Sequence, residues 1–509
     1  MKRLSVTGTV RGAPRPVMVT AMCVVAVFAV AVPSVSPAAA QSLLPEHVGR
    51  SHVSGLHAPS GAHLPFAGSA QAVCGQPGVG VAHCLTDVLE LSAAAPDTAT
   101  PTGLSPGTIE GVYGYTSAST AGFGQTIALV DAFNDPDAAS DLNEFSAQYG
   151  LPTECTGGSS PPSCFEFRQV NQTGGSSLPT TNSGWDLEIS LDIEWAHALA
   201  PAASILLVEA TNNYTPNLLT AEQYAADNAE YVSNSWGSPE FTGETSYDSY
   251  FTQPGVSFFA AAGDSGGHVE WPSSSPDVIS VGGTSLRFNS WGNLVRETAW
   301  SHGGGGCSSY ETANTYQLTG SVSCAGMRAT PDLALDANPN SGVSVYDSVP
   351  CEDHSGWFTI GGTSASTVMV AAEAAVTGAE VNAKYIYASP ANIPFRDVTA
   401  GSNGYPALPG YDLATGLGAW SYAPVPNGLN AMSVSGSVTL SWLEHRLRHG
   451  GPRWIQQETC NAPVPLLMPC RVHGTLPRSV SPIPTARPVK GGSKGGPRDE
   501  ASSSSSDFD

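Results

Sequence analysis

Basic residues are scarce in this sequence of 509 residues, which has 20 Lys and Arg against 43 Asp and Glu. The imbalance is concentrated in residues 51–440, where 6 basic residues stand against 36 acidic ones. Binding of nucleic acid needs clusters of basic side chains, so we expect no nucleic-acid partner. Such an acidic chain repels itself less when its carboxylates are protonated, which suits work in acid; adaptation to salt is the other explanation.

Long apolar runs are also lacking, apart from the 16 residues from Val17 to Val32. That run is short for a membrane-spanning helix. Basic residues precede it and Ala38-Ala39-Ala40 follows it, which is the pattern of a secretory signal peptide over residues 1–40. We therefore expect a secreted, extracellular protein without a membrane partner, acting as a monomer.

None of the ten cysteines has the Cys-x-x-Cys spacing of a zinc site. Cys23 lies in the predicted signal peptide and is removed with it. Cys351 has no cysteine close to it in the sequence with which it would form a pair. The other eight form close sequence pairs that could be local disulfides in an oxidising compartment. These pairs are Cys74/Cys84, Cys155/Cys164, Cys307/Cys324 and Cys460/Cys470.

Composition divides the remaining chain into three stretches. Residues 41–104 are rich in Ala, Pro, Gly, Ser and His, and we interpret them as a short propeptide or leader. Residues 105–432 alternate apolar runs with helical patterns, as one large domain does. Residues 433–509 are rich in Pro, Gly, Arg and Ser, so we expect a low-complexity, disordered tail.

The alternation in residues 105–432 predicts an α/β fold with a doubly wound, mostly parallel sheet and helices on both faces. The expected strands are 126–130, 205–208, 232–235, 256–261 and 278–281, and the expected helices include 138–149 and 218–228. Active residues gather at the carboxyl ends of such strands. Asp131, Trp236, Asp264 and the turn at Ser364 all have this position.

The glycine turn before Ser364 is the first candidate site. Gly361-Gly362-Thr363-Ser364 follows an extended run and precedes a helical run from Val368 to about Val381. Glycine lets the backbone approach a substrate closely, and a helix start favours negative charge. Thr363 or Ser364 could instead be an ordinary helix N-cap.

Two acid positions accompany this serine. Glu188 and Asp192 are four residues apart in a predicted helix, so their carboxyl groups share one face and push each other's pKa values apart. Asp264 follows the strand 256–261 in a glycine-rich turn, and in its protonated form it could donate a hydrogen bond to an oxyanion. Each residue could also be structural, since acids four apart and turn aspartates are common.

Together these residues resemble the sedolisin family, the serine-carboxyl peptidases with a subtilisin-like fold. The resemblance covers about residues 105–432 and rests on motifs in a matching order. They are Gly124–Asp131, Glu188-x-x-x-Asp192, Ser233–Gly237, Gly263–Gly266, Pro272–Thr284, Gly362–Ala365 and Gly410–Gly418. It implies an acid-acting endopeptidase for protein or peptide substrates, with Ser364 as nucleophile, Glu188 as general base, Asp192 behind it and Asp264 as the oxyanion-hole acid. From ordinary carboxyl pKa values we expect maximal activity below about pH 5.

The resemblance also implies one structural calcium site. Its ligands would be the carboxylates of Asp397 and Asp412 and the backbone carbonyls of Val398, Leu408 and Gly410, which are hard oxygen donors. The alternative is that both aspartates only form turns.

The sequence departs from the family pattern in a few places. Val368 stands where the motif usually has proline, and the leader of 64 residues is shorter than the family's prodomains, which bears on whether the chain is a zymogen. These departures leave a second reading, a non-catalytic secreted binding protein on a peptidase scaffold. His197 and His268 we interpret as packing or surface residues.

Overall fold

A computed structural model of the chain describes residues 68–75, 77–91, 100–156, 159–317, 324–351, 354–388, 393–423, 438–442 and 456–460. The predicted signal peptide and most of the predicted tail therefore lie outside the described residues. Within the tail, β20 (Val438–Trp442) and β21 (Gln456–Cys460) pair as antiparallel strands. No helix in the described ranges is both long enough and apolar enough to cross a membrane.

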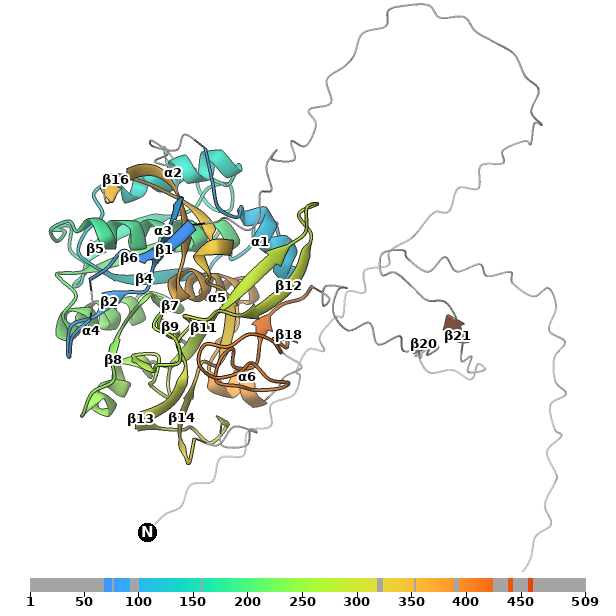
Figure 1. Cartoon of the computed structure of the whole chain (residues 1–509). Helices are drawn as coiled ribbons and strands as arrows, with labels where there is room; N and C mark the ends of the chain where they lie inside the picture. The colour runs from blue at the N-terminus through green and yellow to red at the C-terminus, as the bar shows by residue number, and fades with distance from the viewer. Residues whose placement is uncertain are drawn as a thin grey trace, which may run out of the picture. The chain divides into compact units, whose positions relative to one another are not determined.

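The main sheet has eight strands and is parallel except at one edge (Figure 1). Only β12 (Leu294–Ala299) runs antiparallel in this sheet, beside β11 (Ile279–Phe288), whereas β15 (Leu333–Asp336) joins β11 in parallel. The predicted parallel sheet is thus confirmed. In spatial order the strands are β12 (Leu294–Ala299), β11 (Ile279–Phe288), β9 (Ser257–Ala261), β7 (Tyr231–Asn234), β4 (Thr126–Ala132), β6 (Ser204–Ala210) and β5 (Phe167–Asn171), with β15 (Leu333–Asp336) paired to β11.

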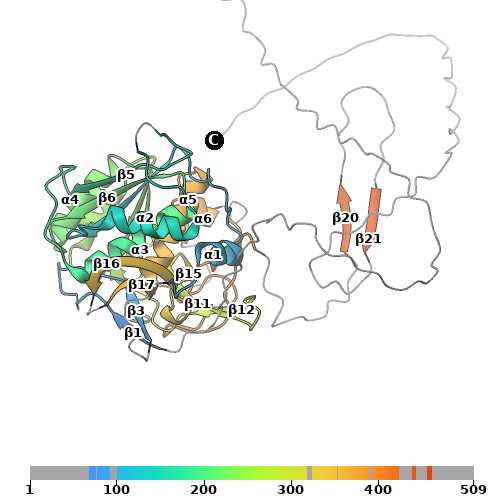
Figure 2. The same ribbon diagram turned by 90° about the horizontal axis from the view of Figure 1, so that it is seen from above.

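Helices cover both faces of this sheet because its strands are apolar on both sides. In β4, Ile127 and Leu129 pack into one core together with α2 (Ala138–Tyr149), α3 (Ser183–Leu199) and α5 (Thr363–Thr377). Ala128 and Val130 pack into another core together with α4 (Thr215–Ala226). Figure 2 shows α2 and α3 side by side.

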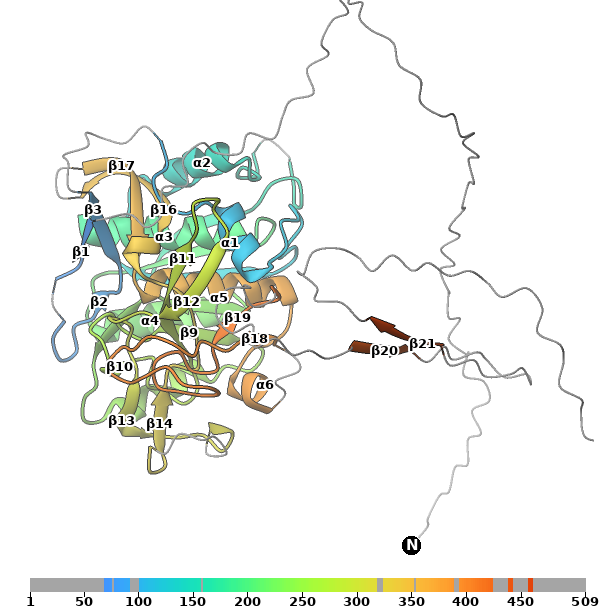
Figure 3. The same cartoon turned by 45° about the vertical axis from the view of Figure 1, so that its right-hand side comes forward.

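The segment before residue 105 joins sheets of the main body. The strands β1 (Gly68–Ala72) and β3 (Asp87–Leu91) extend the pair β17 (His354–Gly361) and β16 (Val343–Cys351), as Figure 3 shows. Between them, β2 (His83–Cys84) pairs with β8 (Trp236–Pro239), which also pairs with β10 (Glu270–Trp271). The predicted leader therefore supplies strands to the same fold, and its boundary at residue 104 stays a prediction.

Helix α5 begins and ends earlier than we expected. It starts at Thr363, directly after Gly362 with φ 104°, and not at Val368. It ends at Thr377 because Gly378 has the left-handed φ of 65° and its N–H closes the last turn onto Ala374 and Ala375. The expected end near Val381 was therefore wrong.

The remaining elements are short and surround the sheet. They are α1 (Pro106–Tyr113), α6 (Ala383–Ala388), β13 (Gly306–Thr312), β14 (Met327–Thr330), β18 (Phe395–Arg396), β19 (Ala419–Trp420) and the 3₁₀ helices Glu244–Phe251 and Pro339–Ser341.

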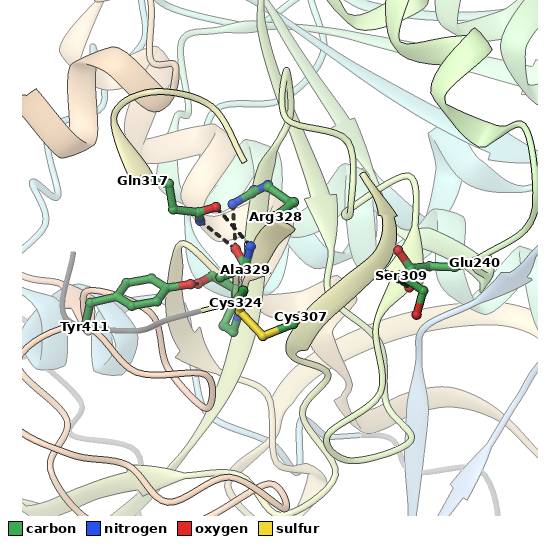
Figure 4. Close-up of a disulfide and its surroundings, with 9 residues drawn as sticks. Glu240, Cys307, Ser309, Gln317, Cys324, Arg328, Ala329 and Tyr411 are labelled. Atoms are coloured by element: carbon green, nitrogen blue, oxygen red, sulfur yellow. Dashed lines mark hydrogen bonds between the residues drawn. A yellow bond between two sulfur atoms is a disulfide. The ribbon is translucent and has the colours of Figure 1, made fainter. Parts of the chain in front are cut away.

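Three of the four predicted cysteine pairs are disulfides: Cys74–Cys84, Cys155–Cys164 and Cys307–Cys324. The pair Cys460/Cys470 is not tested, because residue 470 lies outside the described residues, and Cys351 is buried. Figure 4 shows the Cys307–Cys324 disulfide close to Arg328 and Gln317, which both donate to the carbonyl oxygen of Ala329, at 2.7 and 2.6 Å.

Candidate active site

Ser364 lies in the first turn of α5, immediately after β17, and is completely buried. Its hydroxyl donates to the carbonyl oxygen of Ser235, at 3.2 Å. Its backbone N–H donates to the carbonyl oxygen of Leu85, also at 3.2 Å. The backbone N–H at this helix start thus serves an oxygen acceptor, which is the arrangement that stabilises an oxyanion.

Helix α3 carries Glu188 and Asp192 on the face that packs against α5. Asn182 caps this helix, since its side-chain oxygen accepts from the N–H of Trp185 at 3.3 Å. Both acids are fully buried. Asp192 Oδ1 accepts from the hydroxyl of Ser235 at 2.9 Å. Ser235 therefore contacts both Ser364 and Asp192 and links the two helices.

Glu188 faces the candidate nucleophile. Burial raises its pKa well above the ordinary value, and the charge of Asp131 raises it further, while the hydroxyls of Thr86 and Ser364 lower it. None of these groups reaches ordinary hydrogen-bond geometry, so within the described residues both Glu188 carboxylate oxygens have no regular partner. Catalytic hydrogen bonds are often long before a substrate binds.

Asp131 is a third buried carboxyl group in this cluster, which we had placed at a strand end without giving it a role. It lies near the carboxyl end of β4, and burial raises its pKa to about 7. The charges of Asp131 and Glu188 both raise the pKa of Asp192, after the larger effect of burial. Three adjacent acids cannot all ionise in a buried site, so they must share protons.

Asp264 follows β9 and reaches the start of α5 from the other side. Its Oδ1 accepts from the N–H and the hydroxyl of Thr363, both at 2.8 Å. A methyl group on Gly362 would stand 2.8 Å from Asp264 Oδ2 and would collide with the Leu85 carbonyl oxygen, so both oxygens lie beside the same backbone atom. Burial, and then the charge of Asp87, raise the pKa of Asp264 well above its ordinary value.

The structure thus brings all four predicted catalytic residues, Ser364, Glu188, Asp192 and Asp264, to one place at the carboxyl edge of the sheet. Thr363 and Ser235 complete the arrangement, although the sequence indicated for Thr363 only a possible N-cap role and for Ser235 only a place in the motif Ser233–Gly237. His197 lies elsewhere: it is buried, contacts the ring of Phe165 at 3.9 Å between centroids, and its pKa is lowered to about 4 by burial. Its packing role matches our interpretation.

The five predicted calcium ligands also lie in one group of turns. The N–H of Gly410 donates to Asp397 Oδ2 at 2.9 Å, and the N–H of Leu408 donates to Asp412 Oδ2 at 2.7 Å. The Thr415 hydroxyl lies between Asp412 Oδ1, at 3.3 Å, and the carbonyl oxygen of Val398, at 3.5 Å. Asp397, Asp412 and the Val398 carbonyl oxygen thus lie in hydrogen-bonded turns, and carboxylate and carbonyl oxygens are the donors that a hard cation takes.

A parallel sheet with helices on both faces and a serine at a helix start facing buried acids defines a protein of subtilisin-like fold. The sequence profile described as the Subtilase family matches residues 180–398. Kumamolisin of Bacillus sp. (strain MN-32) is 31% identical over 370 residues, which cover 64% of this chain and 63% of that protein. Sedolisin of Pseudomonas sp. (strain 101) is 28% identical over 411 residues, which cover 71% and 65%.

A solved structure with a similar fold is that of Pseudomonas sedolisin, a serine-carboxyl proteinase complexed with two molecules of pseudo-iodotyrostatin. Its TM-score is 0.52 at 24% identity, and the match covers 63% of this chain and 96% of that chain. The chain is therefore similar to members of the sedolisin family. It spans just under two thirds of the length of the two curated relatives that it matches.

Proposed function

We propose that this protein is a secreted, acid-acting serine-carboxyl endopeptidase that hydrolyses proteins or peptides through an acyl-enzyme. The observation that carries the proposal is the meeting of Ser364 with Glu188, Asp192 and Asp264 at one helix start. Ser235 connects two of these residues directly, because its carbonyl oxygen accepts from the Ser364 hydroxyl at 3.2 Å and its own hydroxyl donates to Asp192 at 2.9 Å.

In the proposed reaction Ser364 Oγ attacks the carbonyl carbon of the substrate and passes its proton to ionised Glu188. Asp192 and Asp131 adjust the protonation of Glu188. The backbone N–H of Ser364 and the protonated carboxyl of Asp264 donate to the oxygen that becomes negative. Glu188 then returns the proton to the leaving amine, and water hydrolyses the acyl-enzyme.

The proposed roles predict a bell-shaped dependence of the rate on pH. The acid limb reports ionisation of Glu188, because only the carboxylate can accept a proton. The alkaline limb reports loss of the proton from Asp264, because its carboxylate cannot donate and would repel the oxyanion. The raised pKa of Asp264 keeps that proton in place beyond the ordinary carboxyl range.

A casein digest at pH 3–4 with wild type beside Ser364→Ala tests the proposal. We expect cleavage by wild type and a loss of about 10⁴-fold or more in the variant. Activity that survives the substitution would remove Ser364 from its role. If wild type does not cut casein either, the result favours the alternative, a binding protein on a peptidase scaffold.

Two further parts of the proposal, export and a calcium site, rest on other observations. Export is supported by the three disulfides, which persist in oxidising compartments, and by the signal pattern of residues 1–40. A structural calcium ion is supported by the donor set around Asp397 and Asp412. A bound ion would hold the turns of residues 397–412 together, and it takes no part in the proposed reaction.

A further inference from the structure

Thr363 is completely buried between the start of α5 and the turn that follows β9. Its hydroxyl does not cap its own helix, because α5 begins after Gly362 without a hydrogen bond from a capping side chain. Instead, Thr363 Oγ1 accepts from the backbone N–H of Gly263 at 3.1 Å and donates to Asp264 Oδ1 at 2.8 Å. The hydroxyl therefore contacts both residues of the turn that carries the proposed oxyanion-hole acid.

The direction of these hydrogen bonds follows from the number of protons. A backbone N–H can only donate, so in its bond with Gly263 the Thr363 hydroxyl is the acceptor. A hydroxyl has one proton, and here that proton is directed at Asp264 Oδ1. The N–H of Thr363 has no partner inside the helix, and it donates to the same carboxyl oxygen at 2.8 Å. Asp264 Oδ1 thus accepts two hydrogen bonds.

The other oxygen of this carboxyl group has a different environment. Asp264 Oδ2 is buried and has no hydrogen-bond partner among the described residues. It lies beside Gly362, since a methyl group on that glycine would stand 2.8 Å from it. The same methyl group would collide with the carbonyl oxygen that accepts from the N–H of Ser364. Oδ2 is therefore the carboxyl oxygen on the side where the oxyanion would form.

We propose that Thr363 is a positioning residue that decides which oxygen of Asp264 carries the proton. This inference rests on the proposed peptidase function, and Thr363 acts in it only through Asp264. Two donors already point at Oδ1, so the neutral acid keeps its own proton on Oδ2. The O–H of Asp264 then points towards the oxyanion before a substrate arrives, and it needs no reorganisation during the reaction.

The hydroxyl of Thr363 has a second effect, on the pKa of Asp264. Burial, and then the charge of Asp87, raise this pKa, whereas the two hydrogen bonds from Thr363 lower it. Thr363 therefore directs the proton to Oδ2 and also lets the acid lose that proton at a lower pH than it otherwise would. The titratable groups that face Asp264 or its neighbour Asp87 are Glu270 of β10, His83 of β2 and His302.

Thr363→Val tests the proposal, because it removes the hydroxyl and keeps the size and branching of the side chain. The readouts are kcat, KM and their pH dependence for the full chain on a peptide substrate. We expect kcat to fall by about 5–50-fold with KM within about twofold, because part of the neutral Asp264 then carries its proton on Oδ1 and the Gly263 N–H loses its acceptor. The alkaline limb should move to higher pH, because the ionised Asp264 loses a donor.

Two further variants separate this role from a purely structural one. Thr367 is a buried threonine one turn further along α5, and its hydroxyl donates to the carbonyl oxygen of Thr363 at 2.7 Å. Thr367→Val should leave kcat within about twofold of wild type and the alkaline limb in place. Thr363→Ser keeps the hydroxyl and should restore most of the rate and the wild-type limb. A lower kcat in Thr363→Val without an upward shift of the alkaline limb would overturn the inference, as would an equal effect of Thr367→Val.

A second measurement does not depend on cleavage. In full-length Ser364→Ala at acid pH, the infrared carbonyl band of neutral Asp264 is identified as the band that Asp264→Asn removes. Thr363→Val should raise the frequency of this band, because the carbonyl oxygen Oδ1 loses one of its two donors. An unshifted band would overturn the inference even if the peptidase is active. If wild type cleaves no peptide, the proposed function fails, whereas a shifted band still supports the control of this proton by Thr363.

Discussion

Two buried carboxyl groups, those of Asp332 and Glu188, differ in how many hydrogen bonds they accept. The difference distinguishes a structural acid from a proposed catalytic one. Asp332 accepts from Arg328 through both of its oxygens, from the N–H of Ser280 at 2.7 Å and from the hydroxyl of Tyr387 at 2.6 Å. Glu188 is equally buried, yet no described residue gives its oxygens a regular hydrogen bond.

The pairing of Asp332 fixes its negative charge, because removal of either partner would leave a buried ion alone. At Glu188 no regular hydrogen bond stabilises the ionised form, so burial raises the pKa of this carboxyl group and its proton is not fixed by a partner. A buried acid that stabilises the fold is surrounded by hydrogen-bond donors, as Asp332 is. A buried acid that transfers protons has few such donors, as Glu188 has.

The largest expected effect is a loss of catalytic rate when Glu188 can no longer accept a proton. Glu188→Gln is expected to lower kcat by about 10²–10⁴-fold, the usual contribution of a general base. Thermal stability should stay the same or rise, since an amide needs no charge in this buried position. Glu222→Gln is the control, because Glu222 is also a fully buried helical acid but lies in α4 on the opposite face of the sheet. A loss of rate in both variants would count against a specific role for Glu188.

Breaking the fixed pair should have the next largest effect. Arg328→Met is expected to cost about 3–5 kcal/mol of unfolding free energy, because Asp332 would remain buried without its cation. Calorimetry or urea unfolding measures the loss. Arg296→Met, at an exposed position, should change stability by less than about 0.5 kcal/mol. A similar small change for Arg328→Met would show that Asp332 needs no fixed partner.

Calcium removal tests a third kind of carboxylate. Asp397 and Asp412 each accept a backbone N–H and are proposed to share a cation. Chelation should lower Tm, corresponding to about 2.7 kcal/mol if calcium is present at a hundredfold excess over its Kd. The double variant Asp397→Asn with Asp412→Asn should no longer respond to chelator. A wild-type Tm that does not depend on calcium would remove the site.

The smallest expected effect is a change in the pH dependence of stability. Burial raises the pKa of Glu222 from 4.5 to about 8, and a hydrogen bond from Asn234 partly opposes this. The folded state therefore keeps a proton that the unfolded chain releases, so this stability is complete below about pH 4.5 and is lost as pH rises towards 8.

Glu222→Gln should accordingly match wild type at pH 4 and exceed it at pH 5.5 by about 1–2 kcal/mol, since each pKa unit corresponds to about 1.4 kcal/mol. Unfolding curves at the two pH values give the difference. The opposite order, with the variant less stable at pH 5.5, would show that the ionised carboxylate is the form that the fold prefers.

Much of the fold could be predicted from the sequence, because the periodicity of apolar residues indicates strands and helices locally. The apolar run in β4 and the helical pattern of α2 gave the correct elements, and the spacing of Glu188 and Asp192 gave the shared face of α3. The role of Asp131 was not visible, because it depends on strands and helices that are distant in the sequence. The start of α5 was misplaced because Thr363 and Ser364 suit both a turn and a first helical turn.

The contact between Leu85 and Ser364 left no signal of this kind either. Leu85 belongs to a stretch with weak periodicity, and nothing in its neighbours indicates which strands it pairs with. Only the antiparallel register of β2 with β8 and of β3 with β17 identifies the residue that lies at the nucleophile. Such pairings between distant segments are set by the assembled sheets and not by local propensity.

Gly362 makes the entrance of a peptide chain depend on a single missing methyl group. Its φ of 104° already disfavours any other residue, and a Cβ atom there would occupy the space of the carbonyl group of residue 85. The methyl group of an alanine at this position would exclude a peptide carbonyl group from this space. Any peptide backbone that Ser364 attacks must therefore fit into the space beside Gly362 that a Cβ atom would fill.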